Sequence, residues 1–319
     1  MSALLILLRE RPGRPAAPET LPLGRAALRL EAEGQPVLLG ATIRTGVATG
    51  LRAQPGGWTQ ATLPVIALHD RFPGWSWPDP WEAALGQAAG LPIGNPRWLT
   101  ELCRDKLACQ RALEDAGLPC PPVEADPGRF AERLAEWGHA FLKPRHGSLG
   151  RGVRFVRPGD PLPAQGPGAG TRSRDANVLQ SAVLSAPPMA LRVVLQRDVA
   201  GWIALSPVAR CADDPVVNVE RGADARLARE VLAPQALEAC LSLAHRACLA
   251  LLAHGDATFA LELGFDLVLD GDGRPWIIEV NPAPRGRLRA LAKGSAQLRE
   301  EHDAACLRPL RRLLATARG

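Results

Sequence analysis

Asp266, Glu279 and Asn281 bring two carboxylates and an amide into one short stretch, residues 259–284 (FALELGFDLVLDGDGRPWIIEVNPAP). Oxygen atoms of such groups are the ligands that hard divalent cations such as Mg²⁺ prefer. Apolar and polar residues alternate on both sides of Asp270–Gly273, whose composition is typical of a tight turn. The stretch is therefore predicted to be a β-hairpin that presents these ligands.

The face on which the ligands lie depends on the register of this hairpin. With Leu269 opposite Trp276, Asp266 faces Glu279, and Asn281 lies about 7 Å further along the strand on that side. Two carboxylates directly opposite each other repel, so they need a cation between them or exposure to water. The sequence leaves both open: a magnesium site, or a strand face that points to solvent, as in many antiparallel sheets.

A glycine-rich loop further upstream could bind phosphate. It lies in FLKPRHGSLGRGVRFVRPG, residues 141–159, between two predicted strands. Glycine lets backbone N–H groups approach phosphate oxygens, and Lys143 adds a positive charge just before the loop. The pattern is neither a Walker A loop nor a Rossmann turn. Alone, it also fits a hairpin tip that only turns the chain.

Three more basic residues lie on predicted regular elements. Lys106 belongs to an amphipathic helix predicted over Leu99–Ala116, which Gly117 ends. Arg192 and Arg210 belong to two strands predicted within 190–211. The two arginines could reach an anion, but each of the three residues, taken alone, is more commonly a solvent-exposed surface residue.

The remaining segments indicate a mixed α and β chain. Short apolar runs separated by Gly and Pro predict a small α/β unit up to about residue 97. A further strand is predicted at 178–184. Leu232–His254 is predicted to be an apolar helix, and Ala292–Gly319 a basic amphipathic helix that closes the fold.

Composition narrows the class of protein. The 319 residues carry a formal charge of +5 without a Lys or Arg run that resembles a nucleic-acid-binding arm, and this charge suits an anionic small ligand. The 7 cysteines include no CxxC pair and no zinc spacing, which favours reduced thiols and a cytoplasmic protein. No apolar run reaches the length of a membrane span. Neither nucleic acid nor membrane is thus expected as a partner, while the charge suits a small anionic ligand as well as a larger one.

The order of these features resembles the ATP-grasp superfamily over about residues 98–290. It runs from a helical lysine, a strand lysine and a glycine-rich loop to strands with arginines, a helix and an acidic hairpin that ends in Glu-Val-Asn-Pro. RVVLQRDVAGWIALSPVAR, VVNVERGA and ELGFDLVLDGDGRPWIIEVN are most similar to the YheC/YheD-type, endospore-coat-associated branch. Glutathione-synthetase-like and ribosomal-protein-modifying ligases are next.

The resemblance implies an α+β ATP-grasp fold. Two α+β subdomains, 98–175 with the glycine-rich flap and 176–319 with the metal-binding strands, would clasp ATP behind an N-terminal α/β domain, 1–97.

The resemblance also implies a role for each site residue. The implied ligands of ATP are Lys106, Lys143, Gly147, Ser148, Gly150 and Gly152 for the phosphates, and Gln180, Ala182 and Val183 for adenine. Arg210 and Arg192 would hold the γ-phosphate or the intermediate, and Asp266, Glu279 and Asn281 would bind Mg²⁺ (two ions, with Mn²⁺ as an alternative). The chain departs from many relatives in having Ala190 in place of Asp, and no acidic residue for the ribose is evident after Gln180.

The activity that the resemblance implies is ATP- and Mg²⁺-dependent ligation of a carboxylate to an amine through an acyl phosphate. Such a site needs no nucleophilic side chain, and the sequence shows no Ser-His-Asp or Cys-His set. Two other classes stay open: an ATP-grasp kinase or phosphotransferase, and a non-catalytic ATP-binding protein of a coat or assembly. The partners that the resemblance implies are a nucleotide and a small-molecule or peptide carboxylate and amine, and the sequence identifies neither these substrates nor the oligomeric state.

Overall fold

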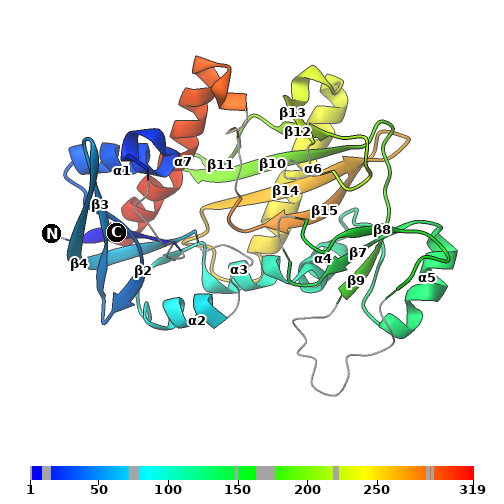
Figure 1. The fold of residues 1–319 in the computed structure, drawn as a ribbon, viewed down its shortest axis with the longest axis horizontal. Coiled ribbons are helices and arrows are strands. Elements are labelled where there is room, and N and C mark those ends of the chain that lie inside the picture. Colours follow the sequence, from blue (N-terminus) through cyan, green and yellow to red (C-terminus); the bar gives the residue numbers. More distant parts are fainter. Residues whose placement is uncertain are drawn as a thin grey trace.

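The structure is a computed structural model, shown in Figure 1, in which helices pack on three β-sheets. It describes residues 2–8, 16–71, 79–147, 150–162, 177–217, 223–284, 288 and 291–319. Of the predicted site residues, Ser148 lies outside these ranges.

The N-terminal sheet combines parallel and antiparallel pairing. Its strands are β1 (Ala3–Leu7), β2 (Val37–Arg44), β3 (Val47–Gln54), β4 (Gly57–Asp70) and β5 (Ile93–Gly94). The long strand β4 pairs with β3 through residues 57–64 and with β1 through residues 65–70. Because β1, β4 and β5 run parallel, the carboxyl ends of β4 and β5 lie at one edge of the sheet.

Helices from both ends of the chain cover this sheet. Helix α1 (Pro22–Ala32) packs beside α7 (Ala296–Arg318), the predicted closing helix, and Leu30 and Leu310 share a buried cluster with strand residues. Helix α2 (Asp79–Gly86) contributes the fully buried Trp81 to another cluster. The C-terminal helix is therefore part of the core that the N-terminal sheet forms.

The second sheet is small and carries the glycine-rich loop. Its order is β6 (Val123–Glu124), β9 (Asn177–Ser181), β7 (Ala140–Pro144) and β8 (Arg154–Val156), and α5 (Phe130–Trp137) packs on it. Two helices precede it: α3 (Arg97–Arg104) and α4 (Lys106–Asp115).

The prediction of a single helix over 99–116 is wrong, because the helical conformation is interrupted at Asp105 and two helices result. The side chain of Asp105 accepts hydrogen bonds from the backbone N–H groups of Leu107, at 3.1 Å, and Ala108, at 3.2 Å. It therefore caps a new helix, and Lys106 becomes the first residue of α4.

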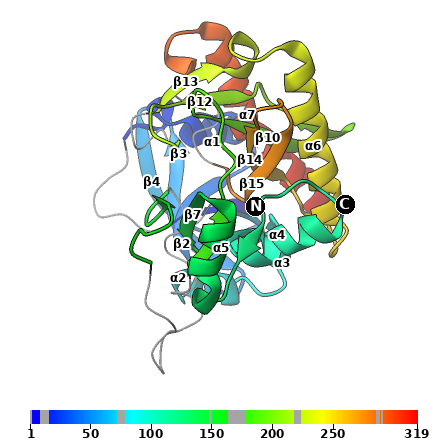
Figure 2. The ribbon, with the colours of Figure 1, turned by 90° about the vertical axis from the view of Figure 1, so that its right-hand side faces the viewer.

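The third sheet forms the centre of the molecule. Its order is β13 (Asp224–Leu227), β12 (Val208–Cys211), β10 (Met189–Asp198), β14 (Glu262–Leu269) and β15 (Pro275–Asn281), and β11 (Gly201–Ala204) pairs with β10. The segment 190–211, predicted as two strands, thus contains three. Helix α6 (Pro234–Leu252) covers one face of this sheet. In Figure 2, which is turned by 90° from Figure 1, α6 lies beside β10, β14 and β15.

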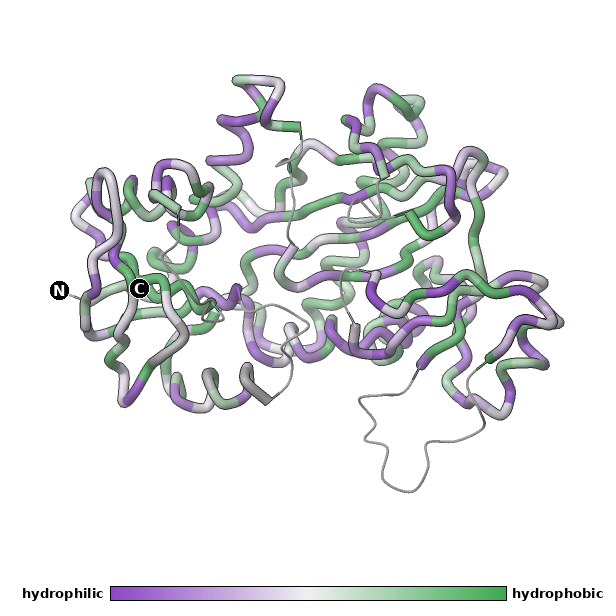
Figure 3. Tube along the Cα trace, viewed as in Figure 1, coloured by the Kyte–Doolittle hydropathy of each residue, from purple (hydrophilic) through white to green (hydrophobic). Residues whose placement is uncertain are grey.

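Hydrophobic and hydrophilic residues are interleaved along the central strands, as Figure 3 shows. The apolar side joins α3, α4 and α6 in one core cluster, whereas the other side carries Arg192 and Asp266 and is partly covered by α7. Short 3-10 helices lie at Pro18–Thr20, Pro127–Arg129, Ala228–Glu230 and Leu291–Lys293.

All seven cysteines are free, and Cys211 alone among them is not buried. Among the described helices, none has the length and apolar character that a membrane crossing requires.

Candidate functional site

The hairpin of β14 and β15 brings Asp266 opposite Glu279. The predicted register is wrong at the turn, where Leu269 lies opposite Pro275 instead of Trp276. A shift in register between Leu267 and Asp266 then restores the predicted pairing of the two acidic residues. One extra residue on β15 therefore brings the carboxylates face to face.

Asp266 is held by two arginines from neighbouring strands. Arg192, its register partner on β10, donates from Nε to Oδ1 at 2.6 Å and from Nη2 to Oδ2 at 2.7 Å. Arg210 on β12 donates to Oδ1 as well, and Asn281 Nδ2 donates to Oδ2 at 3.2 Å. Burial opposes ionisation of Asp266, but the two arginines outweigh it and lower the pKa of this carboxyl to about 2.

Arg210 has an N–H group that no described residue accepts. Its Nε is buried without a hydrogen-bond partner in the part of the chain that the structure describes. Burial, its largest influence, and the nearby charge of Arg192 lower the pKa of this guanidinium. An anion at this place would accept the free N–H and offset the crowding of positive charge.

Lys106 connects the hairpin with the glycine-rich loop. Its Nζ lies 3.4 Å from Glu279 Oε1 and donates to the carbonyl of Gly147 at 2.5 Å. Lys106 therefore lies between a predicted metal ligand and the loop that is predicted to cover the phosphates.

Lys143 is buried at the base of the same loop, with 8% of its surface exposed. Its Nζ donates to Gln180 Oε1, and Gln180 in turn donates from Nε2 to Gln110 Oε1 at 2.9 Å. Burial lowers the pKa of Lys143 to about 8, against the raising effect of Glu279. This lysine is therefore held in an environment that an anionic ligand would improve.

A pocket lies between the hairpin and the small sheet. Among the residues that line it are Lys106, Lys143, Gln180 and Glu279, together with apolar side chains such as Val178. Its lining thus combines charged and apolar groups, as phosphates and an aromatic base would require. Its volume of about 20 Å³ is smaller than a nucleotide, so the walls must move apart for ATP to bind.

The predicted adenine ligands are only partly brought together. Gln180 lines the pocket, but it does so with a side chain already bound to Lys143 and Gln110. Ala182 donates its backbone N–H to the carbonyl of His139 at 3.1 Å, and neither it nor Val183 belongs to the described pocket lining. Their role in binding adenine stays a prediction.

The glycine-rich loop needs its glycines for its conformation. Gly150 and Gly152 have φ angles of 67° and 72°, in the left-handed region. A Cβ atom on Gly152 would lie 2.9 Å from Cγ of Pro144. The loop is joined to α4 by Arg145, which binds Asp105 through Nε at 2.7 Å and Nη2 at 2.6 Å.

The charges of the site fit a nucleotide with a divalent cation. Four basic side chains, those of Lys106, Lys143, Arg192 and Arg210, face the carboxylates of Asp266 and Glu279. Two positive charges are thus in excess, which a triphosphate would offset. Two carboxylates and an amide are an oxygen donor set for Mg²⁺, and no group of three His, Cys, Asp or Glu side chains that could hold a metal ion occurs among the described residues.

Sequence reasoning missed several residues that support this site. Asp105 and Arg145 are one such pair, and Gln110 is the partner of Gln180. Asn95 and Arg71 bind the segment that follows Asn281. Asp105 at the start of a helix was a visible capping signal, whereas the other contacts join residues far apart in the chain and leave no local pattern.

Comparison with known structures defines the fold. D-cycloserine synthetase DcsG is 16% identical, with 99% of this chain and 100% of that chain covered and a TM-score of 0.62. D-alanine–D-alanine ligase from Bacillus anthracis is 14% identical (99% and 97% covered, TM-score 0.62). A RimK domain ATP-grasp protein from Sphaerobacter thermophilus DSM 20745 is 18% identical (96% and 98% covered, TM-score 0.56). The chain has the α+β ATP-grasp fold, as predicted.

Within this fold, residues 177–308 match the model of the YheC/D like ATP-grasp family. The predicted resemblance to that branch is therefore confirmed, and the matching segment contains Arg192, Arg210 and the whole hairpin. No curated protein sequence matches the chain.

Proposed function

We propose that the chain is an ATP- and Mg²⁺-dependent ligase that joins a carboxylate to an amine through an acyl phosphate. The observation that carries this proposal is the pair of largely buried arginines on Asp266, one of which has an N–H group without a partner among the described residues. A purely structural ion pair would need one arginine. Two arginines beside two lysines are suited to an anion whose charge moves during reaction.

Each group has a role in this proposal. Lys106 and Lys143 bind the phosphates of ATP, with Gly147, Gly150 and Gly152 covering them. Arg210 and Arg192 hold the γ-phosphoryl group during its transfer to the substrate carboxylate, and they then stabilise the acyl phosphate until the amine attacks. Asp266, Glu279 and Asn281 hold Mg²⁺, which supplies charge neutralisation between the phosphates.

Both arginines bind Asp266, so the proposal requires these contacts to rearrange when the phosphates and the metal ion bind. The phosphates offer the arginines other acceptors, and Asp266 is then available to the metal ion. We also propose the division into residues 1–97, 98–175 and 176–319, with ATP between the latter two units.

Hydroxylamine gives a test that does not require the natural amine. It reacts with an acyl phosphate to give a hydroxamate, so the protein is incubated with ATP, Mg²⁺, hydroxylamine and a panel of carboxylic acids. We expect hydroxamate and ADP with at least one acid, and neither product with Glu279→Gln.

Other results identify the alternative classes. ADP together with a phosphorylated product that persists in hydroxylamine would show a kinase or phosphotransferase. Binding of ATP without ADP for any acid would favour a non-catalytic nucleotide-binding protein.

A further inference from the structure

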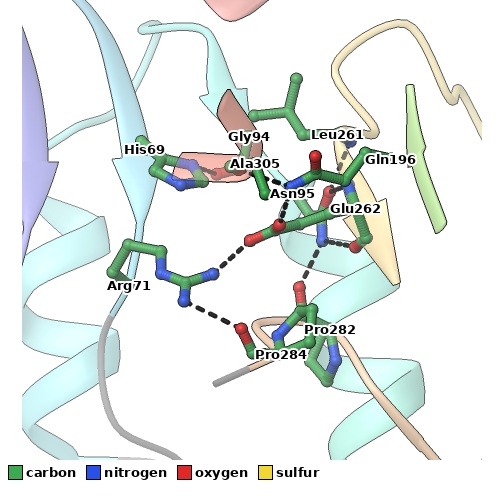
Figure 4. A network of polar contacts seen from close by, with 10 residues as sticks. All are labelled: His69, Arg71, Gly94, Asn95, Gln196, Leu261, Glu262, Pro282, Pro284 and Ala305. Carbon is green, nitrogen blue, oxygen red and sulfur yellow. Dashed lines mark hydrogen bonds and ion pairs between the residues drawn. The ribbon is translucent and has the colours of Figure 1, made fainter. Parts of the chain in front are cut away.

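The segment that directly follows Asn281 is held by side chains of the N-terminal sheet. The carbonyl of Pro282 accepts a hydrogen bond from Asn95 Nδ2 at 2.5 Å, and that of Pro284 accepts one from Arg71 Nη2 at 3.0 Å (Figure 4). Pro284 also packs closely on Gly264, because a Cβ added to Gly264 would lie 2.7 Å from the Cβ of Pro284. Two hydrogen bonds and one packing contact thus hold the segment that follows β15.

Asn95 and Arg71 reach this segment because of the sheet topology. Strands β4 and β5 run parallel, with His69 beside Gly94, and Arg71 and Asn95 follow their carboxyl ends. His69 Nδ1 lies 3.1 Å from the carbonyl of Gly94. Both side chains therefore leave the same edge of the N-terminal sheet and meet the hairpin there.

Asn95 uses the whole hydrogen-bonding capacity of its amide on the open end of the hairpin, where β14 begins and β15 ends. Its Oδ1 accepts from the backbone N–H groups of Leu261, at 2.6 Å, and Glu262, at 3.2 Å. Its Nδ2 donates to the carbonyl of Glu262, at 2.7 Å, and to that of Pro282. One buried side chain therefore ties the first residue of β14 to the residue after β15.

Arg71 joins the same segment to a buried polar network. Besides Pro284, its guanidinium binds the carboxylate of Glu262, which is 1% exposed. Glu262 Oε2 also accepts from Gln196 Nε2 at 2.8 Å, and Gln196 Oε1 accepts from Arg308 of α7 at 2.8 Å. Every charge in this chain of contacts has a partner, so the network can hold a fixed geometry in the core.

We propose that Asn95 and Arg71 are positioning residues for the site of the metal-bound nucleotide. By fixing Pro282 and Pro284, they set where Glu279 and Asn281 lie relative to Asp266. The inference rests on the proposed function, because it concerns the metal ligands of that site. Groups that orient metal ligands commonly change metal affinity by about 10- to 100-fold when they are altered.

Asn95→Asp is the sharpest variant, since it keeps the shape and both acceptor contacts and removes the two donors. ATP binding is measured by calorimetry with Mg²⁺ and with a chelator in its place. We expect affinity with Mg²⁺ to fall about tenfold or more, and affinity with the chelator to stay within about twofold. Arg71→Lys keeps the charge beside Glu262 but loses one arm of the fork, so we expect a smaller change in the same direction.

Gln35→Glu is the matched control. Gln35 is a buried amide, 5% exposed, that donates to the carbonyls of Ser2, at 3.2 Å, and Pro36, at 3.0 Å. This variant makes the same chemical change away from the hairpin, and we expect neither affinity to move.

Three results would overturn the inference in distinguishable ways. Unchanged Mg²⁺-dependent binding in Asn95→Asp, with wild-type binding intact, would reject the positioning role alone. Equal losses with and without Mg²⁺, or the same loss in Gln35→Glu, would show a general effect on folding. Wild-type binding that does not depend on Mg²⁺ would overturn the proposed metal site and this inference with it.

Discussion

Arg192 binds both carboxylate oxygens of Asp266, the residue directly opposite it across β10 and β14. Arg210 adds a third contact from β12 to the same carboxylate. Asp266 thus forms ion pairs with two largely buried guanidinium groups, in addition to its proposed role with the metal ion. Its removal has consequences for stability as well as for ligand binding.

We expect Asp266→Asn to lower the free energy of unfolding by about 3 kcal/mol at pH 7, because both arginines lose their buried partner. The pKa of Asp266 is depressed from 3.8 to about 2, so its contribution is present above pH 4 and is lost as pH falls towards 2. The difference in the free energy of unfolding between variant and wild type, measured with urea, should therefore become smaller below pH 4.

Glu101→Gln serves as control for that measurement. Glu101 pairs with Arg97 on an exposed turn of α3, and an exposed pair of this kind contributes about 0.5 kcal/mol or less. A similar loss of unfolding free energy in both variants would contradict the expected contribution of the Asp266 contacts to stability.

Lys143 predicts a pH dependence of nucleotide binding. Burial lowers its pKa to about 8, so the lysine loses its charge as pH rises through that value. We expect the dissociation constant for ATP to increase about tenfold between pH 7 and pH 9. In Lys143→Arg the group stays charged, and the profile should be flat over this range. Parallel profiles for the two proteins would show that another group titrates.

The pair of Asp105 and Arg145 predicts an effect on the glycine-rich loop. Asp105→Asn keeps an oxygen for capping α4 but removes the charge that binds Arg145. If the lost ion pair with Arg145 contributes about 1 kcal/mol to the loop conformation that binds ATP, we expect the affinity for ATP to fall roughly fivefold, which calorimetry can resolve.

Asp126→Asn is the control for the loop. Asp126 caps the short helix at Pro127–Arg129 by accepting from Gly128 N at 2.9 Å, and it has no ion pair within the described ranges. If both variants bind ATP as the wild type does, Asp105 acts only as a helix cap.

Gly264→Ala tests the close packing behind the site. Its new Cβ would lie 2.7 Å from Cβ of Pro284, so the chain must move, at a cost of about 1–3 kcal/mol. Gly271→Ala in the turn meets nothing within 4 Å and should change stability by less than about 0.5 kcal/mol. Equal melting temperatures for the two variants would show that residues 282–284 can move to accommodate the new Cβ without loss of stability.

The hairpin shows how far the sequence alone predicts this site. Alternation identifies both strands and pairs Asp266 with Glu279, yet it fails at the turn. Two consecutive isoleucines, Ile277 and Ile278, satisfy the apolar pattern in either register, so the irregularity beside them leaves no trace in the sequence.

Contacts between distant residues are the part that sequence patterns cannot supply. Asn95 lies 187 positions from Pro282, and its importance depends on the parallel pairing of β4 and β5. The double arginine contact of Asp266 likewise depends on the order of β12, β10 and β14 in the sheet. The types of residue were visible in the sequence, whereas their partners required the fold.

Thermal unfolding with ATP, with and without Mg²⁺, tests the central claim most directly, using the wild type and Glu279→Gln. A ligand at 100 times its dissociation constant stabilises by about 2.7 kcal/mol, which raises the melting temperature by several degrees. We predict that Mg²⁺ markedly increases the shift that ATP causes in the wild type and has little effect in Glu279→Gln. No shift with ATP in either protein, or the same shift in both with and without Mg²⁺, would contradict a nucleotide and metal site at Asp266 and Glu279.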